Sequence, residues 1–327
     1  MGGYHSPLAL GAFGAVLLAA CARVALPPPG SPVPSFPGEP WRSERIAVVA
    51  QINAARAEVG LGPLAYDPLL ERIGDAHCTI LIEEGGDGHF SRSGVPPYLR
   101  YLLVGGSGFH QENVGSYSTT GKVADSALAR ILSASVEDML AEVPPNDGHR
   151  RALLDPSVTH VGVGLAVREG EVRMTHELAT EVTQSWTPPP AVAAPGTPVA
   201  LSGRLARPWQ PEAVEVLWEK LPRPLSDAQL RTIRAYGYPQ RRATFHVNRA
   251  VAPESTAVFT VDRLGVLRFR WSAGPHEGVE IVLLWARNGH DRQLVVVAAS
   301  ATVVVGTAEL PPELAFWQRL RSSPTQP

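Results

Sequence analysis

The sequence predicts an α+β protein in which a three-layer α-β-α sandwich is followed by an all-β sandwich. Three observations support this fold class. Before residue 143, apolar residues recur at helical spacing in three segments. From residue 161 onward, they fall mostly in short runs that are typical of strands. The chain has 327 residues, of which 44% are apolar, and a proline-rich stretch divides it, so each of two domains can have its own core.

The N-terminal segment predicts export. Residues 7–20 form an apolar run that is shorter than a usual membrane-spanning helix and has the length of a signal-peptide core. It ends in Leu18-Ala19-Ala20-Cys21, which resembles a bacterial lipobox, where the cysteine is lipidated and becomes the first mature residue. The alternatives are an ordinary signal sequence or a misassigned start codon, because residues 1–6 contain no Lys or Arg. We therefore expect residues 1–21 to be a signal peptide with a lipobox, and the protein to be lipid-anchored in the cell envelope, at a membrane or cell surface.

Proline content sets the next boundaries. Residues 22–40 are dense in proline, which favours an extended stalk, and a second proline-rich stretch at 188–195 is expected to be a linker. The predicted folded units are therefore residues 41–187 and 196–306, with a tail at 307–327.

Composition limits the partners and the source of stability. The net charge of −2 gives no electrostatic reason to expect a nucleic-acid partner. If Cys21 carries lipid, Cys78 has no partner for an intrachain disulfide, so core packing must stabilise the mature protein. Cys78 lies on an apolar helix face and is expected to be a small buried residue rather than a nucleophile.

Three helices are expected in the first domain. The first is stopped by Gly60-Leu61-Gly62, and the second begins with Asp67 as N-cap and Pro68 at the first helical position and ends at Gly85-Gly86. The third runs over about 123–143 and is terminated by Pro144-Pro145. The inward side chains expected for the first helix are Ile46, Val49, Ile52, Arg56 and Val59, and those for the third are Leu128, Ile131, Leu132, Val136, Met139, Leu140 and Val143.

The remainder of the first domain is expected to be loop and strand. Residues 87–121 are rich in glycine and serine with little periodicity, which indicates a loop with a short helix near 98–103. Residues 161–167 alternate like a strand, Glu169-Gly170 is a turn signal, and 172–184 supplies further extended stretches. Interleaved helices and strands of this kind favour the α-β-α layering.

The second domain is expected to be an immunoglobulin-like β-sandwich. Its seven short extended runs are rich in branched and aromatic residues and are separated by polar breaks. Ser226 and Gln229 predict a capping box at one interrupting helix, and a further short helix is expected at 313–320. The runs are 199–201, 214–218, 243–247, 257–261, 266–271, 279–285 and 294–305.

Two histidines and two carboxylates form the candidate site: His89, Glu112, Glu142 and His149. Each lies in a short polar motif beside glycine, proline or a helix end, which predicts one convergent cleft. Imidazole and carboxylate side chains bind hard or borderline metals and transfer protons near neutral pH. The alternative is a hydrogen-bonded polar network that supports the cleft without chemistry.

The first domain resembles the CAP superfamily, which comprises cysteine-rich secretory proteins, antigen 5 and pathogenesis-related proteins and is also called SCP-like. The resemblance rests on several motifs in the family's order and spacing. They are Ile52-Asn53-Ala54-Ala55-Arg56, Gln111-Glu112-Asn113-Val114, Gly148-His149-Arg150 with the following Leu154-Asp155-Pro156, and His160-Val161-Gly162-Val163-Gly164.

This resemblance implies the three-layer sandwich with a central cleft that holds two His and two Glu and can bind zinc or another divalent cation. His89 and His149 would be the metal ligands, and Glu112 matches the Glu-Asn motif. The second glutamate is expected to be Glu142, with Glu137 as the competitor on the same helix. The two are five residues apart and point about 140° apart, so only one can face the cleft.

The leading functional expectation is a binding protein for a small apolar ligand, a divalent metal or an envelope component. Lipid and sterol binders in the family make an apolar ligand an expectation of the resemblance. One alternative is a metal-assisted hydrolase or protease that uses His89, Glu112 and His149. The other is a structural adhesion protein in which the β-sandwich carries recognition.

Overall fold

The computed structural model describes residues 41–248, 257–289, 293–307 and 309–322. The expected signal peptide, Cys21 and the proline-rich stalk lie outside these residues. No helix among the described residues is long and apolar enough to cross a bilayer.

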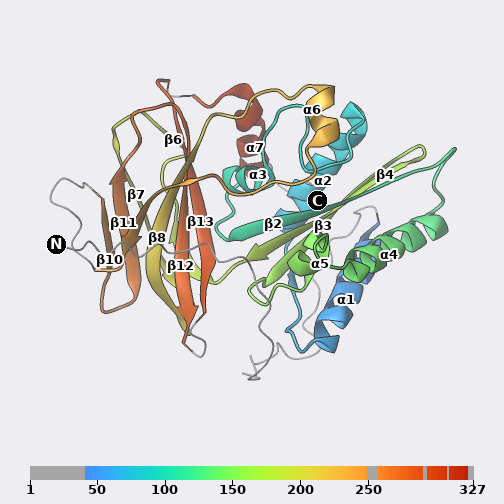
Figure 1. The fold of residues 1–327 in the computed structure, drawn as a ribbon, viewed down its shortest axis with the longest axis horizontal. Coiled ribbons are helices and arrows are strands. Elements are labelled where there is room, and N and C mark those ends of the chain that lie inside the picture. Colours follow the sequence, from blue (N-terminus) through green and yellow to red (C-terminus); the bar gives the residue numbers. More distant parts are fainter. Residues whose placement is uncertain (1–40, 249–256, 290–292, 308, 323–327) are drawn as a thin grey trace.

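The first domain is built around a four-stranded sheet with helices on both faces (Figure 1). The strand order is β1(Ala65–Tyr66)-β3(His160–Arg168)-β4(Glu171–Thr180)-β2(Phe109–Ser118), with β1 parallel to β3 and the other pairs antiparallel. Helix α2(Pro68–Glu84) covers one face of this sheet. The other face carries α1(Arg42–Glu58), α4(Asp125–Ala141) and α5(Gly148–Leu153). The chain is therefore α+β, with the expected three layers in its first domain.

Local sequence signals explain where the helices begin and end. The Asp67 carboxylate accepts the backbone N–H groups of Leu69 and Leu70, and Gly85 adopts a φ of 68° at the C-terminal end, as predicted for α2. The first helix is present, and three of its five predicted side chains face the core: Ile52 and Arg56 are buried and Val49 packs against the core. Ile46 and Val59 are exposed instead, and Arg45 and Val48 are buried in addition. Val143 is also exposed, because α4 ends before it.

Strand β2 corrects the prediction of a loop over 87–121. The short helix is present as α3(Pro97–Leu103), but Phe109–Ser118 pairs with β4 along its whole length. Polar side chains conceal this strand in the sequence, because His110, Gln111, Glu112 and Asn113 interrupt the alternation of apolar and polar residues that marks a strand. As a result, Glu112 and Asn113 lie on an ordered strand at the edge of the sheet.

The second domain consists of two facing sheets. One has the order β10(Val258–Val261)-β11(Val266–Ser272)-β7(Pro198–Leu205)-β5(Thr183–Thr187), and the other has the order β6(Val192–Ala193)-β13(Leu294–Val304)-β12(Gly278–Asn288)-β8(Trp209–Glu219)-β9(Arg241–His246). An apolar core fills the space between them, with aromatic contacts such as Phe269 on Trp271. Strand β5 precedes the expected boundary at residue 187 and pairs with β7 of this domain.

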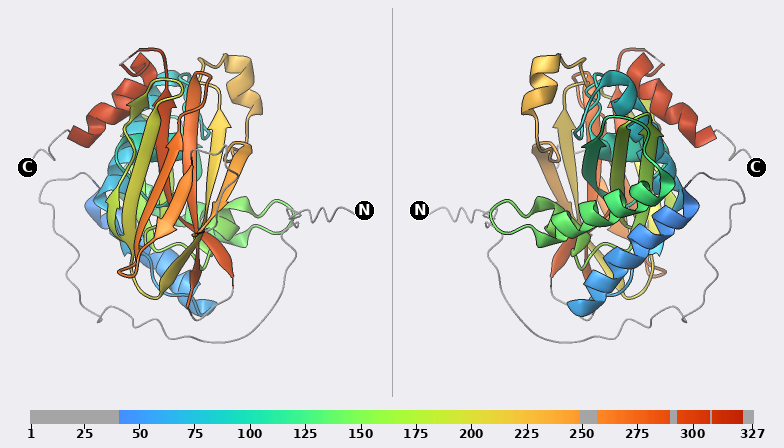
Figure 2. Two further views of the ribbon diagram at one scale, coloured as in Figure 1. Left: turned by 90° about the vertical axis from the view of Figure 1, so that its left-hand side faces the viewer. Right: turned by 90° about the vertical axis from the view of Figure 1, so that its right-hand side faces the viewer.

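Besides the core inside each domain, a further apolar core lies between the two domains. Along β12, alternate side chains belong to different cores, since Ile281 and Leu283 pack toward the first domain and Val282 and Leu284 pack into the sandwich. Tyr98 and Leu99 of α3 lie on the first-domain side of this shared core. The five-stranded sheet is therefore covered on both faces, by the other sheet and by the first domain (Figure 1). Figure 2 shows the molecule from the side of the sandwich and from the side of the first domain.

The C-terminal tail also packs on the first domain. Helix α7(Pro312–Ser322) lies against α3, and its Leu314 and Trp317 side chains are almost fully buried. Helix α6(Asp227–Thr232) has the predicted capping box, in which Ser226 and Gln229 bond each other's backbone. It buries none of its own residues and lies beside the loop that follows α2 (Figure 1).

Candidate functional site

The structure forms two separate His–Glu pairs from the four predicted residues. In the first pair, His89 Nδ1 lies 2.9 Å from Glu112 Oε1. The other Glu112 oxygen forms a salt bridge with the Arg100 guanidinium, which also donates to the His89 carbonyl at 2.9 Å. The Glu112 side chain is 0% exposed and that of His89 is 12% exposed. Glu112 is therefore fully buried and His89 keeps only a small exposed area; we call this largely buried pair the sealed pair.

The charge on Glu112 is stabilised by its neighbours. Burial alone would raise the pKa of this carboxyl, but the Arg100 guanidinium and the adjacent imidazoles outweigh burial and hold its pKa well below the usual range. Glu177, opposite Glu112 on β4, has its pKa raised by burial and by the Glu112 charge, so it holds a proton. Its Oε2 lies 2.8 Å from Nε2 of His110, which burial keeps neutral by lowering its pKa to about 3.

The second pair is open to solvent. His149 Nδ1 lies 2.5 Å from Glu142 Oε1, and the other Glu142 oxygen accepts the backbone N–H groups of His149 and Arg150 at the start of α5. The side chains of His149 and Glu142 are 36% and 23% exposed. Burial acts to raise the pKa of Glu142, but these hydrogen bonds lower it below its usual value. The pair therefore combines a helix cap with an accessible imidazole.

Strand β2 connects the two pairs. Glu112 and Asn113 are successive residues, so their side chains project to opposite faces of the sheet. Glu112 contacts His89, while the Asn113 amide donates to the His149 carbonyl at 3.1 Å. No hydrogen bond or ion pair joins one His–Glu pair to the other among the residues the structure describes.

Other candidate residues have structural contacts. Glu137 contacts Ser133 and Gln51 rather than a histidine. His77 is fully buried with Nε2 3.1 Å from the Gly88 carbonyl, and Cys78 is buried with a raised thiol pKa, as expected. His110 is also fully buried.

His176 differs from these because neither of its ring nitrogens has a hydrogen-bond partner in the described structure. The side chain is 0% exposed, and burial, followed by the nearby His149 charge, lowers its pKa to about 4. A neutral imidazole without partners in a polar region can receive a ligand group.

The residues present fit a bound metal only in part. In both pairs a carboxylate holds Nδ1 and leaves Nε2 for another partner, which is the arrangement that supports metal-bound histidines. However, the described residues contain no group of three His, Cys, Asp or Glu side chains placed to hold one ion. This donor set does not fit a closed metal centre.

Three residues at the site were not predicted from sequence: Arg100, Trp317 and Tyr236. Arg100 neutralises Glu112 from an otherwise apolar helix turn, and its guanidinium lies 5.5 Å from the ring centroid of Trp317. Tyr236 reaches the site from the second domain, with its ring centroid 4.8 Å from that of His89 and its hydroxyl 2.5 Å from the Glu112 backbone nitrogen. A single arginine within an apolar run was a usable signal for Arg100, whereas nothing local marks the other two as site residues.

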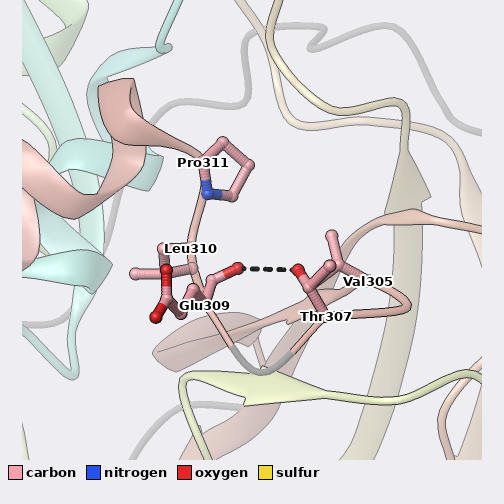
Figure 3. A pocket seen from close by; sticks show the side chains of 5 residues that line it. All are labelled: Val305, Thr307, Glu309, Leu310 and Pro311. Carbon is pink, nitrogen blue, oxygen red and sulfur yellow. Dashed lines mark hydrogen bonds between the residues drawn. The ribbon is translucent and has the colours of Figure 1, made fainter.

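A surface hollow of about 490 Å³ lies where β13 leads into α7 (Figure 3). Its walls come from one stretch of chain, in which the Thr307 hydroxyl donates to the Glu309 carbonyl at 3.2 Å. None of the residues of the two His–Glu pairs lines it.

Comparison with known proteins identifies the first domain. This domain is an α-β-α sandwich that carries one His–Glu pair on each side of its edge strand β2. Residues 49–176 match the family described as CAP, the cysteine-rich secretory protein family. The first domain of this chain therefore belongs to the CAP family. No curated protein gives a significant match.

Solved structures with similar folds include an outer surface protein from Borrelia burgdorferi, at 14% identity over 43% of this chain and 94% of that chain, with a TM-score of 0.34. An extracellular SCP-domain protein from Bacillus anthracis is 19% identical over 43% of this chain and 44% of that one, with a TM-score of 0.32. The structure of NaASP2 with Zn2+ is 13% identical over 42% of this chain and 79% of that chain, with a TM-score of 0.30.

Proposed function

We propose that this chain is an exported binding protein whose CAP domain takes a small apolar ligand with one polar end. The apolar part would lie in a groove between α4 and the sheet, and the polar end would face Asn113, His149 and His176. Two observations support the proposal. Gly115 and Met174 line one end of this groove, and the next pair on the same face of the sheet, Asn113 with His176, includes a buried imidazole without hydrogen-bond partners among the described residues.

The groove has a volume of about 440 Å³ and is lined by apolar side chains together with the polar residues Arg130, Ser135 and Asp138. Ile131 and Leu132 of α4 form one wall, and Val172 and Met174 of β4 form its floor. At Gly115 of β2, an added Cβ would lie 2.7 Å from Ser135 Oγ, so the glycine allows α4 to approach the sheet closely at this end of the groove. A cavity of this size and lining is suited to an acyl chain or a similar small apolar group.

The polar end follows from the register of β2 and β4. Gly115 pairs with Met174, and the next pair on the same face of the sheet is Asn113 with His176. Asn113 in turn holds the backbone of His149. A hydroxyl or carboxyl group at this end of the groove would supply the partner that the His176 ring lacks.

Binding of a fluorescent fatty-acid analogue tests the proposal. Ala134→Trp places a large side chain at the mouth of the groove from an exposed helix position, and we expect it to weaken binding about tenfold or more. Ala129→Trp is the matched control, because Ala129 is on the same helix but lines a different groove toward α1. No measurable binding by the wild type, or equal losses in both variants, would refute the proposal.

We further propose that the second domain is immunoglobulin-like and supports the CAP domain rather than acting as an adhesion module. The strand orders β10-β11-β7-β5 and β13-β12-β8 agree with the two sheets of an immunoglobulin sandwich. Its five-stranded sheet is buried on both faces, which reduces the surface available for recognition.

Export and lipid anchoring at Cys21 remain part of the proposal and are supported by the sequence pattern of residues 1–21. Fractionation of cells that express the full chain tests the anchor. We expect the wild type in the membrane fraction and Cys21→Ser in the soluble or secreted fraction; a soluble wild type would exclude lipidation.

A further inference from the structure

A segment of the second domain lies across the CAP site. Residues 221–240, which we call the strap, connect β8 to β9 and include α6. The strap runs beside the loop after α2, where the Leu225 N–H donates to the Arg92 carbonyl at 2.8 Å. A direct connection between two neighbouring strands needs only a few residues, so the length of the strap calls for an explanation.

Two tyrosines of the strap bind the free edge of β2. The Tyr236 hydroxyl accepts the Glu112 N–H, and the Tyr238 hydroxyl accepts the His110 N–H at 3.2 Å and donates to the His110 carbonyl at 3.4 Å. The step of two residues along the strap matches the step of two residues along β2, in opposite directions. The strap therefore follows the edge strand as an added peptide would, but with phenol groups in place of backbone groups.

The tyrosine rings also close the sealed pair. Tyr236 lies edge-on to the His89 ring at 4.8 Å, and Tyr238 stacks on Tyr98 at 4.5 Å and on Phe109 at 4.9 Å. His89 and Glu112 are consequently hidden by a segment from the other domain.

The rest of the strap is weakly held. Its two ion pairs to the first domain, Arg92–Asp227 and Arg234–Asp87, are about half exposed or more at both ends. Such surface pairs contribute little to stability. Helix α6 buries no residue, so apart from the contacts of Tyr236 and Tyr238 little opposes local opening of this segment.

We propose that the strap is a displaceable cover that fills, from within the chain, a binding position for an extended peptide with two aromatic side chains. When the strap lifts, His89 and the edge of β2 become accessible. This inference goes beyond the proposed ligand of the α4 groove and does not depend on it, because the two lie on opposite faces of the sheet.

The reactivity of histidines toward diethyl pyrocarbonate in the full chain, read out by mass spectrometry, tests the cover. We expect His89 to react about tenfold more slowly than His149 in the wild type, because reaction requires opening. In the release variant, Tyr236→Ala with Tyr238→Ala, we expect the His89 rate to rise at least fivefold with the His149 rate unchanged. Tyr117→Ala, which removes an exposed tyrosine elsewhere on β2, should change neither rate.

His77 and His176 are fully buried and report on global unfolding in the same measurement. If they react as fast as His89 in the release variant, the strap is a structural clamp and the proposal is overturned. It is also overturned if His89 already reacts like His149 in the wild type, or if the release variant leaves its rate unchanged.

A synthetic peptide of residues 233–240 tests the binding position. Added to the release variant, it should restore slow reaction of His89, and the same peptide with both tyrosines replaced by phenylalanine should restore it less. Equal protection by both peptides, or none by either, would exclude a position that reads the aromatic hydroxyls.

Discussion

The two His–Glu pairs of this CAP domain have the same chemical groups and different surroundings. Glu112 is fully buried, neutralised by Arg100 and covered by Tyr236, whereas Glu142 and His149 are partly exposed and cap a short helix. One pair is therefore part of the folded core, and the other is available for binding. Substitutions in the sealed pair should mainly reduce stability, whereas substitutions in the open pair should change stability little.

The largest effect is expected from removing the cation of the sealed pair. Arg100→Met leaves the Glu112 carboxylate buried without its counter-charge, which costs about 3–5 kcal/mol of unfolding free energy. In the open pair, Glu142→Gln removes the charge of the carboxylate and should cost about 1 kcal/mol of unfolding free energy, because it weakens a helix cap near solvent. Urea denaturation at pH 7 measures both.

Arg151→Met is the matched control for Arg100→Met. Its guanidinium forms a solvent-exposed ion pair with Asp147, so its removal should change stability by less than about 1 kcal/mol. Similar losses for Arg100→Met and Arg151→Met would contradict the distinction between a sealed and an open pair.

A second comparison concerns two partly or fully buried glutamates with opposite pKa shifts. At Glu112, the Arg100 charge lowers the pKa of the carboxyl more than burial raises it. At Glu219, no cationic side chain among the described residues pairs with the carboxyl, and burial raises its pKa to about 7 although the Tyr98 hydroxyl donates to it at 2.9 Å. A folded pKa above the unfolded value of about 4.3 means that the unfolded state releases its proton first. The stability contributed by protonated Glu219 is therefore lost as pH rises from about 4.3 through 7.

Glu219→Gln should remove this loss, since glutamine stays neutral. We expect the variant to be about 1–2 kcal/mol more stable than the wild type at pH 8 and equal to it near pH 4, after allowance for the partial exposure of the side chain. Glu112 acts in the opposite direction, because its contribution is present above about pH 4.3 and declines as pH falls further. Identical pH profiles for Glu219→Gln and the wild type between pH 4 and 8 would contradict this assignment.

The sequence predicted most elements because their signals are local. The Asp67 cap, the Ser226 capping box and the Glu169-Gly170 turn each act within a few residues, and all three are present. Strand β2 was missed because its partners come from β4, more than fifty residues later, and its own side chains are polar. The burial of Arg45 in α1 was missed because Arg45 forms an ion pair with Asp75, a contact that apolar spacing cannot reveal.

The site was predicted less completely for the same reason. The motifs marked His89, Glu112, Glu142 and His149, and the structure pairs each histidine with one glutamate. The sealing of one pair depends on Tyr236, which lies more than a hundred residues along the chain in another domain. No pattern in the CAP segment alone can indicate such a contact.

The smallest effect is expected for zinc. His89 is enclosed beneath Tyr236 and the described residues offer no group of three donors, so two imidazoles at most would hold an ion. Isothermal titration of the full chain with zinc should therefore show weak binding, and His89→Ala with His149→Ala should change the affinity by less than about threefold. If the wild type binds zinc with submicromolar affinity and the double variant does not, the two imidazoles meet around one ion, and the separation of a sealed pair from an open pair is wrong. The same titration on the strap release variant sharpens the comparison, because a gain in affinity there would show that the cover, rather than the distance between the pairs, keeps zinc out.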